Sequence, residues 1–143
     1  MLYHKQLFRH RPDEGIFGDC YRTAVACILD MPPQLVPHEH RVMTGDEQMA
    51  LIDAFLSPLN IVRIAVPFQI AELKQALAVA NWMTKGLPYV FTGTSANGTH
   101  HCVVGRQDRI IHDPAQDDSG IVGPTDDGHF WIELLVQPLG DEG

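Results

Sequence analysis

Apolar side chains recur at helical spacing in three stretches of the first 84 residues. In the first stretch, apolar residues at positions 21, 24, 25, 28 and 29 form one stripe, which predicts a core helix from about Cys20 to Asp30. Prolines at positions 32 and 33 end that helix. The same spacing predicts helices from about Asp46 to Leu56 and from about Ile70 to Thr84, and Gly86 ends the last one.

The pattern elsewhere changes to short runs rich in β-branched and aromatic residues, which predicts strands. One run, NIVRIAVPF, lies between the second and third helices, and we expect Pro67 to end it. Four more runs follow Gly86, separated by Gly, Asn, Asp and Pro: LPYVFTG, HHCVVGR, RIIHDP and HFWIELLVQP. We therefore expect one α+β domain over residues 1–143, with N-terminal helices packed against a C-terminal antiparallel β-sheet.

The charge and composition of the chain argue against nucleic acid as its partner. The chain has 18 acidic and 10 basic residues, a net charge of −8, and no dense basic cluster that would favour nucleic acid. No apolar run is long enough to span a membrane, and we expect no secretory signal. Three cysteines without a CxxC pair fit a reducing, cytoplasmic setting. We expect a peptide or protein partner, and the sequence predicts no particular oligomeric state.

Cys20 stands at the start of the first predicted helix, directly after Gly18 and Asp19, either of which can cap that helix. A helix N-terminus favours an anion, so a cysteine there is a candidate nucleophile if an imidazolium lies beside it. The charge of Asp19 opposes this effect, and a small core side chain is the alternative interpretation. Cys27 lies about 10 Å further along the helix, too far for a disulfide, and we interpret it as core packing.

His101 and Asp113 lie on two predicted strands that are close enough in sequence to form a hairpin. With an odd-numbered loop, Val104 faces Ile110 and His101 faces Asp113, whereas a two-residue loop places His101 and Asp113 on opposite faces. On the odd-numbered register, Ile111 also shares the face of His101, and Ile110 shares the other. Asp113 would then accept the Nδ1–H of His101 and leave Nε2 to take a thiol proton.

Other histidines allow different interpretations. The same register places His100 on the face away from Asp113, and pairs His112 with Cys102 as buried polar groups. A metal site built from His38 with His40, or from Cys102 with His112, is the main chemical alternative, but neither pair has the spacing of a zinc motif. We therefore expect no metal and no cofactor.

The segments GDCYRTAVACILDMPPQLVPH and GTHHCVVGRQDRIIHDPA together resemble the small papain-like cysteine peptidase domains of bacterial and phage proteins. These domains are related to the double-glycine leader peptidases of bacteriocin exporters. The resemblance covers about Gln6 to Ala115 and implies a papain-like fold. It also implies that Cys20 is the nucleophile, His101 the base and Asp113 the residue that orients it. Gln6 is then the oxyanion-hole glutamine, together with the Cys20 amide.

These features predict a cysteine peptidase that hydrolyses a peptide or isopeptide-like amide through a thioacyl intermediate. Two alternatives stay open at this point. The long separation of Gln6 from Cys20 counts for a peptidase-fold binding module without turnover, and the set of Cys20, His101 and Asp113 counts against it. Deamidation or acyl transfer would use the same thiolate, base and oxyanion hole.

Overall fold

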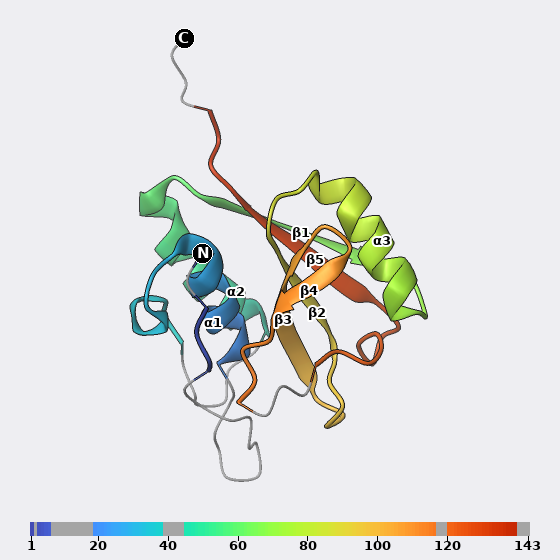
Figure 1. Cartoon of the computed structure of the whole chain (residues 1–143). Helices are drawn as coiled ribbons and strands as arrows, with labels where there is room; N and C mark the ends of the chain where they lie inside the picture. Colours follow the sequence, from blue (N-terminus) through green and yellow to red (C-terminus); the bar gives the residue numbers. More distant parts are fainter. Residues whose placement is uncertain (2, 7–18, 39–44, 117–119, 140–143) are drawn as a thin grey trace.

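The computed structural model describes residues 1, 3–6, 19–38, 45–116 and 120–139. Figure 1 shows a twisted sheet with helices on both sides of it. The helices are α1 (Cys20–Leu29), η2 (Pro33–Leu35), α2 (Gly45–Leu56), η3 (Ser57–Leu59) and α3 (Leu73–Thr84), where η marks a 3₁₀-helix. The strands are β1 (Val62–Phe68), β2 (Tyr89–Thr94), β3 (His100–Arg106), β4 (Arg109–His112) and β5 (Phe130–Val136).

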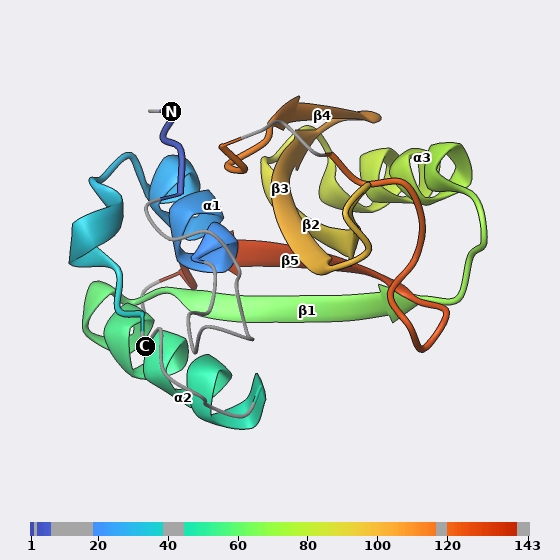
Figure 2. The ribbon, with the colours of Figure 1, turned by 90° about the horizontal axis from the view of Figure 1, so that it is seen from below.

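The five strands form one antiparallel sheet in the order β1-β5-β2-β3-β4. Strand β1 pairs along its whole length with β5, from Val62 opposite Val136 to Phe68 opposite Phe130, and Figure 2 shows the two strands side by side. The prediction of an α+β fold with an antiparallel sheet is confirmed. The sheet is not purely C-terminal, however, because β1 precedes α3 in the chain.

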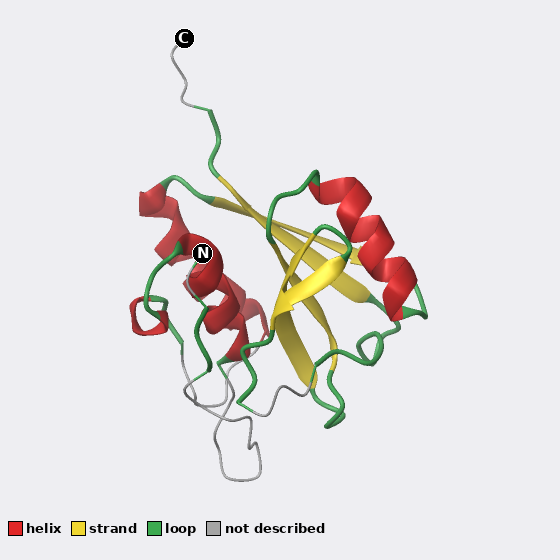
Figure 3. Ribbon diagram, in the orientation of Figure 1, coloured by secondary structure: helices red, strands yellow, loops and turns green. Residues whose placement is uncertain are grey.

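The three α-helices lie on two faces of the sheet and not in one layer. One buried cluster joins α1 and α2 to one face, through residues that include Val25, Ile52, Leu56, Val90 and Val104. A second cluster joins α3 to the other face, through residues that include Ala76, Ala80, Phe91, Val103 and Phe130. Figure 3 shows α1 and α3 with the sheet between them. The central strands carry continuous apolar runs because both of their faces are covered.

The predicted helix bounds agree with the structure to within three residues. Helix α1 ends at Leu29, and Asp30 takes the left-handed conformation, from which its N–H bonds to the carbonyls of Ala26 and Cys27. Helix α3 begins at Leu73 and not at Ile70, because Glu72 has an extended backbone. None of the helices in the described ranges is both long and apolar enough to cross a membrane.

The prediction that Pro67 ends its strand is wrong. Pro67 lies inside β1, opposite Trp131 of β5. Strand β1 is at the edge of the sheet, where one side of the backbone has no neighbouring strand. A proline is tolerated there because its missing N–H removes no bond from the ladder.

The predicted odd-numbered loop between β3 and β4 is also wrong. Arg106 lies opposite Arg109 and Gly105 opposite Ile110, so the turn has two residues, and Gln107 in it has a φ of 57°. A register shift follows, after which Val104 lies opposite His112. Ile111 is therefore the extra residue of a β-bulge, and the bulge restores the alternation that the short turn would have reversed.

The bulge explains which side chains of β4 reach which layer. Ile110 packs in the α3-side cluster with Val103, and Ile111 packs in the α1-side cluster with Val104. Both isoleucines thus lie on the faces opposite to those predicted. Beyond the bulge, Asp113 lies on the same side of the sheet as His101. The odd-numbered register predicts the same placement, but it is the bulge and not the loop length that produces it.

Candidate active site

Cys20 is the first residue of α1, and its side chain is partly exposed. Asp19 occupies the cap position, where its backbone carbonyl accepts the N–H of Thr23 at 3.0 Å. The Asp19 carboxylate does not cap the helix but pairs with Arg22 at 2.9 Å, and both side chains are buried. This ion pair offsets the negative charge beside Cys20 that the sequence suggested would oppose a thiolate. Gly18, the other predicted cap, lies outside the described residues.

His101 on β3 and Asp113 just after β4 are in direct contact. The Nε2 of His101 lies 2.5 Å from Oδ1 of Asp113. The Asp113 carboxylate also accepts the backbone N–H of Ala115 at 2.9 Å and that of Gly120 at 2.6 Å. Burial raises the pKa of Asp113, but the hydrogen bonds from His101, Ala115 and Gly120 lower it by a larger amount. The pKa of Asp113 is therefore below its ordinary value. Asp113 is therefore a fixed carboxylate that holds the ring of His101.

The imidazole is oriented differently from the prediction. From the sequence we expect Nδ1 to bond to Asp113 and Nε2 to the thiol, whereas in the structure Nε2 is the nitrogen that bonds to Asp113. Nδ1 is consequently the ring nitrogen left for the thiol of Cys20. The chemistry is equivalent, because either nitrogen can carry the proton while the other is held.

The side chains of Cys20 and His101 are hydrogen-bonded to each other. Burial lowers the pKa of His101, but the hydrogen bonds to Asp113 and Cys20, and the charges of both, raise it to about 9. The pKa of Cys20 falls well below its ordinary value, through a hydrogen bond from Cys102 and then through His101, although burial raises it. The two shifts favour a thiolate beside an imidazolium at neutral pH.

Cys102 also lies at this site, although the sequence pattern does not predict its contact with Cys20. Its side chain and its backbone N–H both bond to the sulfur of Cys20, and its own sulfur lies 3.3 Å from the hydroxyl of Thr92. The hydrogen bond to Cys20 and burial raise the pKa of Cys102 well above the ordinary value. Of the two thiols, Cys20 carries the charge, because the N-terminus of α1 and the ring of His101 act on it.

Gln6 lies beside the segment that carries Asp113. Its backbone N–H donates to the carbonyl of Pro114 at 2.7 Å, and its carbonyl accepts from the side chain of Gln116 at 3.0 Å. Lys5 supports the same segment by donating to the carbonyls of Asp113 and Ala115. Gln6 is buried. These contacts place Gln6 through its backbone, and its part in an oxyanion hole stays a prediction.

His100 and His112, which neighbour His101 and Asp113 in sequence, contact other groups. The side chain of His100 is exposed, and its Nε2 lies 3.9 Å from the exposed carboxylate of Asp126. The Nε2 of His112 bonds to the carbonyl of His4 at 2.5 Å, and its ring packs against Tyr3. This contact replaces the buried pair with Cys102 that the sequence suggested.

Cys27 and the suggested metal ligands can be placed as follows. Cys27 is fully buried, and burial raises its pKa, in keeping with a packing role. Among the described residues, no group of three or more His, Cys, Asp or Glu is arranged to hold a metal ion. Of the suggested ligands, His40 lies outside the described residues.

A chain of polar side chains, buried around Glu133, anchors Tyr21, the residue that follows Cys20. The hydroxyl of Tyr21 donates to Glu133 at 2.7 Å, and Arg63 donates to the same oxygen of Glu133 at 2.9 Å. Burial raises the pKa of Glu133, and the two donors oppose that rise. Arg63 also pairs with Asp53 of α2 at 2.9 Å. The chain thus ties α1 to β5, β1 and α2.

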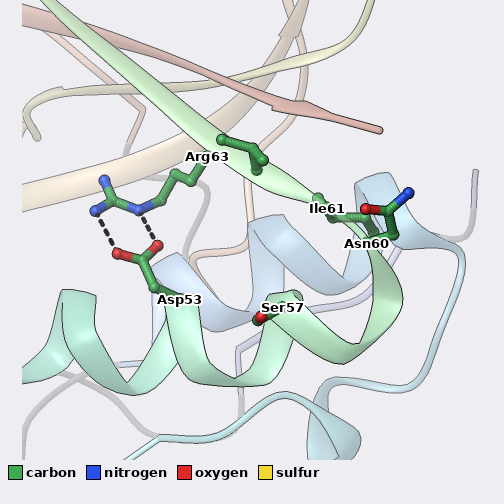
Figure 4. A pocket seen from close by; sticks show the side chains of 6 residues that line it. Asp53, Ser57, Asn60, Ile61 and Arg63 are labelled. Atoms are coloured by element: carbon green, nitrogen blue, oxygen red, sulfur yellow. Dashed lines mark hydrogen bonds and ion pairs between the residues drawn. The ribbon is translucent and has the colours of Figure 1, made fainter. Parts of the chain in front are cut away.

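A hollow of about 300 Å³ lies at the outer end of this polar chain (Figure 4). It is lined by residues of α2, η3 and β1 and of the link between them: Asp53, Ser57, Asn60, Ile61, Val62 and Arg63. The Arg63–Asp53 ion pair forms one wall (Figure 4). Cys20, His101 and Asp113 are not among the residues that line this hollow.

Comparison of the chain with protein-family models, with curated proteins and with solved structures finds no match. Three side chains that are remote in sequence, Cys20, His101 and Asp113, form one hydrogen-bonded series from α1 through β3 to the segment after β4.

Proposed function

We propose that this chain is a papain-like cysteine peptidase that hydrolyses a peptide or isopeptide-like amide through Cys20, His101 and Asp113. The observation that carries the proposal is the hydrogen-bonded series of thiol, imidazole and carboxylate, with the thiol at a helix N-terminus and partly exposed. Cys27 differs, since it is fully buried and its sulfur accepts the backbone N–H of His4.

The proposed reaction begins with the proton of Cys20 already on Nδ1 of His101. The thiolate attacks the amide carbonyl, and the negative oxygen that results is stabilised by the Cys20 amide and Gln6. His101 then gives its proton to the leaving amine, and the C–N bond breaks to leave a thioacyl group on Cys20. A water molecule loses a proton to His101 and attacks the thioester, which releases the acid and restores the thiolate.

Asp113 acts through His101 in this scheme. Its two oxygens are held by the ring and by two backbone N–H groups, so it cannot turn away when the charge on the ring changes. It thereby keeps Nδ1 directed toward the thiol and stabilises the imidazolium. The three cysteines are free, and the mechanism requires Cys20 to remain reduced, so we also propose a reducing, cytoplasmic setting.

Alkylation followed by peptide-level mass spectrometry tests the proposal without knowledge of the substrate. At mildly acidic pH, iodoacetamide should label Cys20 at least about tenfold faster than Cys27 in the same folded chain. Asp113→Asn should slow the labelling of Cys20 and leave that of Cys27 unchanged. Equal, slow labelling of both cysteines would overturn the assignment of a nucleophile.

Peptide libraries then identify the reaction. Wild type should split amide bonds with the addition of one water molecule per bond, and Cys20→Ser should not. Conversion of glutamine or asparagine side chains without chain cleavage would replace peptide hydrolysis by deamidation, and formation of a new amide would indicate acyl transfer. Rapid labelling of Cys20 with a folded chain that binds peptides but turns none over would support the binding module instead.

A further inference from the structure

Cys102 contacts the sulfur of Cys20 from β3, where it directly follows His101 in sequence. His101 and Cys102 both bond to the sulfur of Cys20. Cys102 itself is buried within the α1-side cluster, against which Cys20 packs. Opposite Cys102 in the ladder is Thr92 of β2, whose hydroxyl lies 3.3 Å from the Cys102 sulfur.

We propose that Cys102 is a second hydrogen-bond donor to the nucleophile, giving its S–H to the Cys20 thiolate while its sulfur accepts the hydroxyl of Thr92. The catalytic consequence rests on the proposed function, whereas the effect on the ionisation of Cys20 does not. In this series the hydroxyl of Thr92 donates to the sulfur of Cys102, and the S–H of Cys102 donates to the thiolate of Cys20.

This donor has a role that His101 cannot fill. When the thioacyl intermediate is hydrolysed, the sulfur of Cys20 leaves as a thiolate, and His101 is then receiving a proton from the attacking water. A donor that stays in place throughout the cycle stabilises the sulfur anion at that step. The backbone N–H of Cys102 also bonds to the Cys20 sulfur, so one residue supplies two donors. A charge-assisted hydrogen bond is about twice as strong as a neutral one.

The alternative explanation for Cys102 is a small side chain that fills the core. The two explanations make opposite predictions for substitution. A packing site in an apolar cluster accepts alanine better than serine, because serine adds a polar group. A donor site accepts serine, which keeps an O–H, and loses its function with alanine.

The experiment measures the rate of iodoacetamide labelling at Cys20 against pH, by peptide-level mass spectrometry, in the reduced full-length chain. The variants are Cys102→Ala, Cys102→Ser and Thr92→Val, with Cys27→Ala as the control for loss of a buried thiol. We expect Cys102→Ala to move the midpoint of the profile up by about one pH unit. Cys102→Ser should keep the wild-type midpoint, Thr92→Val should move it upward by a smaller amount, and Cys27→Ala should not move it.

An unchanged midpoint in folded Cys102→Ala, or a midpoint raised equally in Cys102→Ser, would overturn the donor role. If Cys102→Ala does not fold, as judged by circular dichroism, the pair Thr92→Val and Cys102→Ser decides: no shift in Thr92→Val would overturn the proposal. The outcome for the peptidase is separate. A midpoint that depends on Cys102 in a chain without turnover supports the donor and contradicts the peptidase. Turnover in a chain whose midpoint does not depend on Cys102 supports the peptidase and contradicts the donor.

Discussion

The Nε2 of His101 lies 2.5 Å from Oδ1 of Asp113, although a two-residue turn joins the strands on which they lie. A regular ladder with that turn would point the two side chains to opposite faces of the sheet. The bulge at Ile111 adds one residue to β4 and brings Asp113 back to the face of His101. The contact of His101 with Asp113 therefore depends on an irregularity of the backbone, and such bulges are common near functional sites.

Asp113→Asn should remove most of the proposed activity, by roughly 100-fold or more in kcat/KM. The asparagine keeps one acceptor oxygen, but its NH₂ group faces N–H groups that now donate hydrogen bonds to the carboxylate of Asp113. We therefore also expect a loss of about 1–3 kcal/mol in the free energy of unfolding, measured with urea. Asp126→Asn is the matched control: Asp126 is exposed beside His100, and its substitution should change neither quantity. Equal effects of the two substitutions would contradict the role given to Asp113.

Cys20→Ala should abolish turnover while the chain stays folded, because the partly exposed thiol contributes chemistry more than packing. Cys27→Ala should do the opposite. It removes a fully buried sulfur from the core and should cost about 1 kcal/mol of stability with activity retained. Hydrolysis assays and thermal unfolding of both variants check the pair. A folded Cys20→Ala chain that remains active would refute the mechanism.

Arg63→Met should destabilise the fold by about 3 kcal/mol, because it leaves the buried carboxylate of Glu133 without its cation. Asp53→Asn removes the other, half-exposed partner of Arg63 and should cost no more than about 1 kcal/mol. Urea unfolding of the two variants gives the comparison.

The pH dependence of the Arg63→Met variant provides a second readout. Burial already raises the pKa of Glu133, and loss of Arg63 raises it further. The folded variant then holds a proton that the unfolded chain releases, so its stability should recover as the pH falls toward the raised pKa of Glu133. A loss of stability that does not change with pH would show that Arg63 acts through packing alone.

Gly105→Ala should prevent stable folding or cost about 3 kcal/mol or more. A Cβ at this position would lie 2.5 Å from Cζ of Tyr89, a fully buried ring whose hydroxyl is bonded to the carbonyl of Gln107. Gly98→Ala is the control, since nothing lies within 4 Å of its Cβ and only its φ of +80° opposes alanine. We expect a cost of about 1 kcal/mol there. Similar melting temperatures for the two variants would contradict the close approach of Tyr89 to the turn.

The helices and strands could be predicted because each follows a local pattern, whereas the catalytic roles of Cys20, His101 and Asp113 stay a prediction. Helical spacing locates α1, α2 and α3, and a cysteine after Gly-Asp at a helix start is visible in the sequence. The face on which α3 packs could not be predicted. It depends on the continuous apolar runs of β2 and β3, which place Phe91 and Val103 on one face and Val90 and Val104 on the other.

The details of the site depended on register and tertiary packing, which spacing alone does not determine. The left-handed backbone of Gln107 permits the two-residue turn, and neither Gln107 nor the bulged Ile111 is itself a glycine or proline. The contact of Cys102 with Cys20 likewise arises from the way the start of α1 meets β3, although Cys102 was recognisable as the neighbour of His101.

The proposed mechanism requires Cys20 to be a thiolate paired with a protonated His101. The near-ultraviolet absorbance of the thiolate, titrated with pH in wild type and in Cys20→Ser, measures this charge directly. The difference between the two chains should show a thiolate at neutral pH, with a midpoint well below ~8.5, the value of a free thiol. It should also show a second change near the pKa of His101, about 9, as the imidazolium loses its proton. A single midpoint at or above ~8.5 would show that the thiol of Cys20 and the imidazole of His101 are both uncharged at neutral pH, and would contradict the proposed ion pair.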